Sequence, residues 1–206
     1  PTELFFFAIY FILTPKYLKF SYRNNINKLK LINNLEKKIG FPLVVKPLNE
    51  GSSVNVFICN KNNILKTLTK LNEYGEVLLE KYIPGREIQV AILENKVLGA
   101  IELRPTRKFY DYQAKYNPKA RTEHIIPVEI SKRKYQELTK IALKAHKILN
   151  CRGVTRSDFR YYKNSFYLLE TNTQPGMTSL SLVPEIANFN NITFKNLIIK
   201  ILEDAS

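Results

Sequence analysis

Residues 154–182 have the sequence VTRSDFRYYKNSFYLLETNTQPGMTSLSL, which sets polar residues into two otherwise apolar and aromatic stretches. The runs VTRSDFRYY and SFYLLETN have the composition of β-strands, and they flank Lys163 and Asn164. A polar break of this kind typically closes a hairpin. We therefore expect two antiparallel strands that are centred on Asn164.

This hairpin pairs Asp158 with Glu170 and Arg156 with Asn172, and side chains two residues apart share a face of the sheet. Two carboxylates that face each other repel, and their burial without partners is costly. A bound divalent cation would remove both objections. The alternative is a solvated outer face, which the aromatic residues of both strands disfavour. A bulge that slips the register by one residue would separate the pairs.

The bulk composition sets limits on size and partners. A chain of 206 residues with 45% hydrophobic residues forms one large domain or two small lobes. The net charge is strongly positive, since 32 basic minus 18 acidic residues gives +14. The lysines are scattered and form no long basic block, so we expect no nucleic-acid partner and no membrane partner. The charge mainly reflects a bias toward lysine and asparagine.

Two further features bear on the compartment. Cys59 and Cys151 lie far apart without metal-binding spacing, which fits a reducing, cytoplasmic location and supports neither a zinc site nor a disulfide. The apolar run at residues 4–13 is about half of the ~20 residues that span a bilayer. It also lacks the features of a signal peptide, so we expect a buried strand or helix there.

Helices and strands are mixed along the chain, which predicts α+β lobes instead of a doubly wound sheet. Apolar residues at helical spacing predict helices at 24–39, 61–74 and 131–149, and Thr193 is placed to cap a final helix. The expected strands, besides the hairpin, are 42–47, 76–82, 87–93 and 97–103.

Several segments could bind a phosphate or a nucleotide. The loop NEGSSV at residues 49–54 follows a strand that contains Lys46, and its backbone amides and hydroxyls could fold over a phosphate. Glu80 and Lys81 precede a turn, and Glu87 lies on the next strand, which could form an adenosine slot. A surface turn and an exposed hairpin are the alternatives for these two segments. The aromatic segment at residues 109–116 could cover a ligand, and PGMTSLSL at 175–182 could present donors to an oxyanion.

Five stretches in order, FPLVVKPLNEGSSVNV, LLEKYIPGREIQVAIL, FYDYQAKY, GVTRSDFRYY and LLETNTQPGMTSLSLVPE, resemble the ATP-grasp part of the D-alanine–D-alanine ligase family. The resemblance covers roughly residues 13–202, and the PGMT segment after the hairpin is its most specific element. It implies an ATP-grasp fold of two α+β lobes, with ATP held between antiparallel sheets. It further implies ATP-dependent ligation of two D-alanines through an acyl phosphate, for peptidoglycan synthesis and cell wall biogenesis.

The resemblance also implies residue roles. Lys46 and Lys81 would hold the ATP phosphates beneath Ser52 and Ser53. The set expected at adenine and ribose is Glu80, the backbone of Lys81 and Ile83, Phe109 as a stacking ring, and Glu87. Two Mg²⁺ ions, or Mn²⁺ in their place, would be bound by Asp158, Glu170 and Asn172. The residues expected at the reacting groups are Lys115, Tyr116, Ser52, Arg156 and the Gly176 backbone, with Ser181 and Leu182 at the second D-alanine.

Family members carry an N-terminal α/β lobe before this region, and the present sequence does not contain it. We therefore expect an atypical segment at 1–20, which could be a remnant of that lobe, a small ATP-grasp lobe at 21–83 and a large lobe at 84–206. The family is expected to be homodimeric, and much of the dimer contact belongs to the absent lobe. A non-catalytic nucleotide-binding remnant and another ATP-grasp carboxylate–amine ligase are the alternatives.

Overall fold

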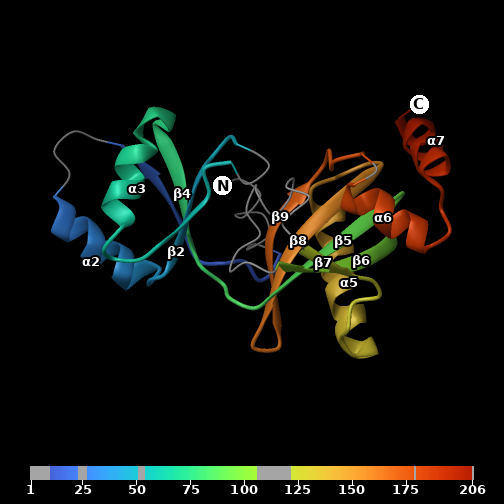
Figure 1. Ribbon diagram of the computed structural model, residues 1–206, viewed down its shortest axis with the longest axis horizontal. Coiled ribbons are helices and arrows are strands. Elements are labelled where there is room, and N and C mark those ends of the chain that lie inside the picture. The colour runs from blue at the N-terminus through green and yellow to red at the C-terminus, as the bar shows by residue number, and fades with distance from the viewer. Residues whose placement is uncertain (1–9, 23–26, 51–53, 106–121, 179, 206) are drawn as a thin grey trace. The chain divides into compact units, whose positions relative to one another are not determined.

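The computed structural model describes residues 10–22, 27–50, 54–105, 122–178 and 180–205 (Figure 1). These residues form two compact units, which are described separately. The described part of the first unit is 15–22, 27–50 and 54–83. The described part of the second is 10–14, 84–105, 122–178 and 180–205.

The first unit contains an antiparallel four-stranded sheet with two α-helices. The strand order is β1 (Tyr17–Ser21), β4 (Glu76–Lys81), β2 (Leu43–Pro47) and β3 (Phe57–Cys59). The helical elements are α2 (Lys28–Lys38), α3 (Ile64–Lys70) and the 3₁₀ turn η1 (Asn72–Tyr74). Alternate residues of the strands, such as Leu43 and Val45, are fully buried and pack with Leu35 and Leu68 of the helices. The period-two pattern of PLVVKP thus gives the sheet one core face and one open face.

Strand β1 begins inside the range 1–20, which was expected to be an atypical N-terminal segment, and ends at Ser21. The strand instead pairs with β4 from Tyr17 opposite Glu80 to Ser21 opposite Glu76. This expectation is therefore wrong for residues 17–20, because they complete the edge of the first sheet. Of the apolar run at 4–13, only residues from Tyr10 are described. Ile12 is buried there, and the Leu13 carbonyl accepts a hydrogen bond from the Leu168 amide at 2.9 Å.

The second unit contains an antiparallel five-stranded sheet. Its order is β7 (Thr122–Ile125), β6 (Lys96–Pro105), β5 (Arg86–Leu93), β8 (Val154–Tyr162) and β9 (Ser165–Asn172). The helices are α5 (Lys132–Ile148), α6 (Leu182–Phe189) and α7 (Phe194–Ala205). Ser131 caps α5 by accepting from the Lys134 amide, as the predicted start of this helix requires. The amide of Asn196 donates to the Thr193 hydroxyl at 3.3 Å, which confirms the predicted cap of α7.

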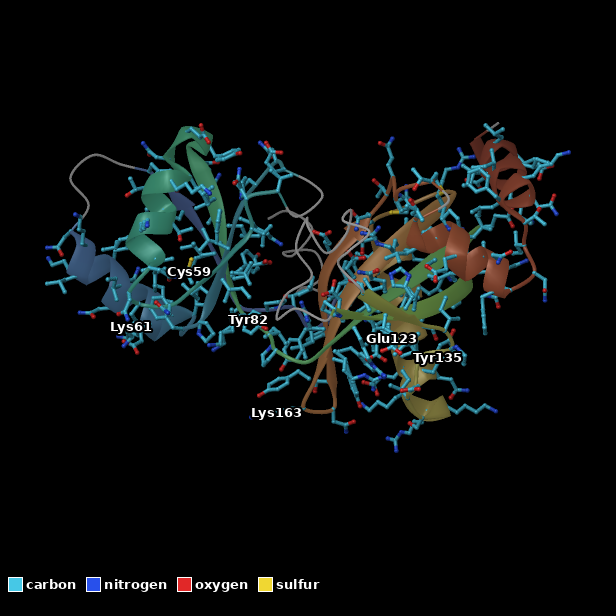
Figure 2. All side chains as sticks on the ribbon, in the orientation of Figure 1. Cys59, Lys61, Tyr82, Glu123, Tyr135 and Lys163 are labelled. Atoms are coloured by element: carbon cyan, nitrogen blue, oxygen red, sulfur yellow. The ribbon has the colours of Figure 1, made fainter. Side chains whose placement is uncertain are left out.

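Strands β8 and β9 form the predicted hairpin, and Figure 2 shows Lys163 at its tip. Lys163 and Asn164 have φ values of 46° and 63°, the left-handed pair of a two-residue type I′ turn. Next to this turn, Tyr162 pairs with Ser165 and Phe159 pairs with Leu168. A bulge between Asp158 and Phe159 then shifts the register by one residue. The bulge was expected to disrupt the facing polar pairs, but its position produces them.

Gly85 lies in the turn before β5, and we expect the Gly85→Ala variant to lose about 2–3 kcal/mol of unfolding free energy. Its φ is +108°, and an added Cβ would collide with the Tyr161 carbonyl oxygen. Gly75→Ala is the matched control, because its φ of +67° carries the backbone strain while no atom lies within 4 Å of the added Cβ. The control is expected to lose about 1 kcal/mol. If urea unfolding shows the same loss of unfolding free energy for both variants, the predicted collision with the Tyr161 carbonyl oxygen is contradicted.

The described residues contain no helix that is both long and apolar enough to cross a membrane. Cys59 is buried, Cys151 is partly exposed, and both are free thiols, as their separation in the sequence predicts.

Candidate active site

The polar pairs of the hairpin lie where the sequence places them. Asp158 of β8 is directly opposite Glu170 of β9, and Arg156 is directly opposite Asn172. Directly opposed residues of an antiparallel pair project from the same face, so these four side chains share one face of the second sheet. The predicted cluster is therefore confirmed as a geometric arrangement.

Hydrogen bonds order this cluster. The Arg156 guanidinium donates from Nε to Asp158 Oδ1 at 2.7 Å and from Nη2 to Oδ2 at 2.9 Å. The Asn172 amide donates from Nδ2 to Glu170 Oε1 at 3.3 Å, which leaves its carbonyl oxygen directed elsewhere. Asp158 is only 7% exposed, whereas Glu170 is exposed. A bidentate arginine–carboxylate pair is the strong form of this contact and fixes the orientation of both groups.

The residues present fit a magnesium ion by the chemistry of their donors. Magnesium prefers oxygen ligands, and in nucleotide sites one or two carboxylates and the phosphates usually hold it together with several waters. Asp158, Glu170 and the Asn172 carbonyl supply two carboxylates and one amide oxygen. In the part of the chain that the structure describes, no set of three His, Cys, Asp or Glu side chains could hold a metal. The cluster suits a cation whose remaining coordination positions are filled by a bound phosphate and by waters.

The same face carries a second ion pair, which the sequence interpretation missed. Glu87 of β5 is opposite Arg160 of β8, and Arg160 Nη2 lies 2.8 Å from Glu87 Oε2. Both side chains are about nine-tenths buried. The alternation of RSDFR at residues 156–160 already places Arg160 on the face of Asp158, so strand periodicity could have found it.

In the first unit, Lys46 of β2 and Glu80 of β4 form an ion pair with Nζ 2.8 Å from Oε2. Glu80 is 4% exposed, and no hydrogen-bond donor reaches its second oxygen, Oε1, among the described residues. Buried carboxylate oxygens normally accept hydrogen bonds. Glu80 therefore offers one acceptor that is suited to an N–H donor from a ligand.

The Lys81 side chain has backbone partners. Residues 80 and 81 project from opposite faces of β4, so the Lys81 side chain lies on the face away from Lys46 and Glu80. Its ammonium donates to the carbonyl oxygens of Gly40 at 3.2 Å and Phe41 at 2.6 Å. Burial lowers the pKa of this ammonium group. In this structure the Lys81 side chain binds the backbone that follows α2, and its role at a phosphate and that of its backbone at adenine stay predictions.

The segment after the hairpin is organised around one hydroxyl. Ser181 Oγ accepts a hydrogen bond from the Thr178 amide at 3.0 Å and lies 2.9 Å from the Thr178 hydroxyl. An added Cβ on Gly176 would lie 2.9 Å from Ser181 Oγ, so the glycine backbone passes close to this hydroxyl. Ser181 precedes α6, and Leu182 is the buried first residue of that helix. The segment thus presents a compact turn at the start of α6.

Five predicted site residues lie outside the described residues: Ser52, Ser53, Phe109, Lys115 and Tyr116. Ile83 is described as a half-buried residue between β4 and β5. The roles of these six residues stay predictions.

A family model for the D-ala D-ala ligase C-terminus matches residues 10–203. The chain belongs to this family. The D-alanine–D-alanine ligase of Pelagibacter ubique (strain HTCC1062) is 62% identical over 195 residues, which are 95% of this chain and 64% of that protein. The chain therefore spans less than two thirds of the length of this relative.

Solved structures agree with this assignment. A D-alanine–D-alanine ligase from Bacillus anthracis superposes with a TM-score of 0.84 at 34% identity, over 98% of this chain and 65% of that one. A D-alanine–D-alanine ligase from Bacillus anthracis complexed with ATP superposes with a TM-score of 0.80 at 31% identity, over 98% of this chain and 64% of that one. The fold is thus the α+β ATP-grasp fold that the sequence predicts.

Proposed function

We propose that this chain is the ATP-binding and catalytic portion of an enzyme that joins two D-alanine molecules for peptidoglycan synthesis. The observation that carries the proposal is the ordered cluster of Arg156, Asp158, Glu170 and Asn172 on one face of a sheet in a member of this family. ATP is the expected nucleotide, since the related Bacillus anthracis ligase is known in complex with ATP.

In the proposed reaction, the carboxylate of the first D-alanine takes the terminal phosphoryl group of ATP, which releases ADP and forms an acyl phosphate. The amine of the second D-alanine then attacks the acyl carbon, a peptide bond forms, and inorganic phosphate leaves. Phosphoryl transfer depends chiefly on positioning and on neutralising negative charge. Magnesium, when bound, would neutralise the phosphate oxygens, held by Asp158, Glu170 and Asn172.

The protein's own groups would divide the remaining tasks between them. Arg156, which Asp158 holds by two hydrogen bonds, would stabilise the oxyanion that forms when the amine attacks. The amide of Gly176 would assist, and Ser181 and Leu182 would line the place of the second D-alanine. Lys115, Tyr116 and Ser52 are proposed to act on the transferred phosphoryl group and to close the site.

Several side chains are proposed to recognise the nucleotide. Lys46 would neutralise a phosphate together with Ser53, and the buried Oε1 of Glu80 would accept from the adenine amine. The backbone near Ile83 would contact the adenine edge, Phe109 would stack on the ring, and Glu87 would take the ribose hydroxyls. A cytoplasmic location follows from the use of ATP and fits the two free thiols. Homodimer formation is proposed only for a protein in which the N-terminal lobe of this family is present.

The test measures phosphate release from ATP with magnesium, with and without D-alanine, together with the formation of the dipeptide. We expect phosphate release to rise by about tenfold or more on addition of D-alanine, with L-alanine as the inactive control. Arg156→Met is expected to lower this turnover by about 100-fold or more while nucleotide binding is retained. ATP binding without D-alanine-dependent release would contradict catalysis by this chain, and absence of magnesium-dependent ATP binding would contradict the whole proposal.

A further inference from the structure

Gln89 of β5 is a buried polar residue whose carbonyl oxygen has no donor among the described residues. Its side chain is almost completely buried, with 2% of the residue exposed. Nε2 donates to Glu87 Oε1 at 3.3 Å, which fixes the orientation of the amide. Oε1 is left without a hydrogen bond from the described part of the chain. Buried amide oxygens are nearly always hydrogen-bonded, so this one points to a donor that a ligand brings.

The sheet register places Gln89 beside the candidate magnesium ligands. Gln89 is directly opposite Asp158 on β8, and Asp158 is directly opposite Glu170 on β9. The three side chains therefore project from the same face and form one row across three adjacent strands. In the neighbouring row, Arg156 and Asn172 occupy the corresponding positions on β8 and β9.

The chemistry of Oε1 restricts what it can bind. A carboxamide oxygen only accepts hydrogen bonds, so a phosphate oxygen, which is also an acceptor, is an unsuitable partner. Magnesium usually keeps several of its waters, and the hydrogens of such waters are donors. Arg156 and Arg160 already donate to Asp158 and Glu87. Because Gln89 shares its row with Asp158 and Glu170, a water on their cation is a donor that the register brings to this row.

We propose that Gln89 is a positioning residue that holds, through Oε1, a water of the magnesium ion bound by Asp158 and Glu170. This inference rests on the proposed function. Glu87 fixes the amide by accepting from Nε2, which leaves Oε1 as the atom without a partner among the described residues. Outer-shell groups of this kind typically change metal affinity by 10–100-fold when they are removed.

The test is the ratio of the ATP dissociation constant in EDTA to that in magnesium, measured by calorimetry. Gln89→Leu removes the acceptor at similar size, and we expect it to lower this ratio by about tenfold. Gln89→Asn keeps the carboxamide, with both its acceptor and its donor, and should restore part of the ratio. The matched control is Thr171→Val, which changes a buried residue on the opposite face of β9 and should leave the ratio unchanged.

The outcomes separate this inference from the proposed function. If the parent chain has a ratio near one, magnesium does not strengthen its binding of ATP, and both proposals fail. If the parent has a large ratio that Gln89→Leu leaves intact, the water contact is refuted and the proposed function stands. If Gln89→Leu loses the same affinity for ATP in EDTA and in magnesium, Gln89 contacts the ribose or supports the fold. That result would also refute the water contact.

Discussion

Replacing Asp158 with asparagine is expected to weaken ATP binding in magnesium by about 100-fold or more, while ATP binding in EDTA changes little. The substitution keeps the size of the side chain and one oxygen acceptor, but it removes the charge that a divalent cation requires. It also removes one of the two acceptors that orient Arg156. The turnover rate should therefore fall by a larger factor than the affinity for ATP. The substitution weakens a metal ligand and also disturbs the position of Arg156.

Two companion variants sharpen this prediction. Glu170→Gln changes the exposed carboxylate directly opposite Asp158 and should weaken magnesium-dependent binding in the same direction. Ser157→Ala is the control, because its hydroxyl lies on the other face of β8, 2.9 Å from the Thr171 hydroxyl. If the Asp158 and Glu170 variants both bind magnesium–ATP as the parent does, the assignment of the metal ligands is wrong.

The hairpin cluster could be predicted because it depends on local periodicity. Residues two apart on a strand share a face, so the sequence alone places Arg156 with Asp158 and Glu170 with Asn172. Their pairing across the hairpin was predicted from the turn, yet the turn alone would not produce it. The two-residue turn starts a register in which Phe159 faces Leu168. The bulge between Phe159 and Asp158 then shifts this register by one residue, so that Asp158 faces Glu170. The position of a bulge depends on packing against the whole sheet, which no short-range pattern contains.

Other features of the site depend on contacts between distant parts of the chain. Lys46 and Glu80 meet because β2 and β4 are neighbours in the sheet. The unsatisfied oxygen of Gln89 becomes visible only once the partner of its Nε2 is known. Sequence periodicity therefore predicts which residues share a face, whereas tertiary structure decides which atoms already have partners.

Replacing Glu102 with alanine is expected to lower the unfolding free energy by about 1.5–3 kcal/mol, because it removes the buried carboxylate that accepts hydrogen bonds from two partly exposed arginines. The Glu102 side chain is 1% exposed. It accepts from Arg86 Nε at 2.8 Å and from Arg104 Nε at 3.0 Å. Arg86 begins β5, and the next residue is Glu87 of the candidate site. Urea unfolding measures the loss, and hydrogen exchange at residues 86–105 assigns it to the second unit.

The control and the pH dependence distinguish this network from an ordinary surface ion pair. Glu129→Ala removes a partner of Arg104 that is 65% exposed, so it should cost at most about 1 kcal/mol. Burial alone would raise the pKa of Glu102, but hydrogen bonds from Arg86 and Arg104 outweigh it and lower the pKa below the ordinary 4.5. The unfolded state then binds more protons between the lowered pKa and 4.5. The carboxylate thus stabilises the fold above pH 4.5, and this contribution is lost as the pH falls through the lowered pKa. Glu102→Gln should flatten the acid side of the stability curve, and an unchanged acid side would contradict the role of this carboxylate.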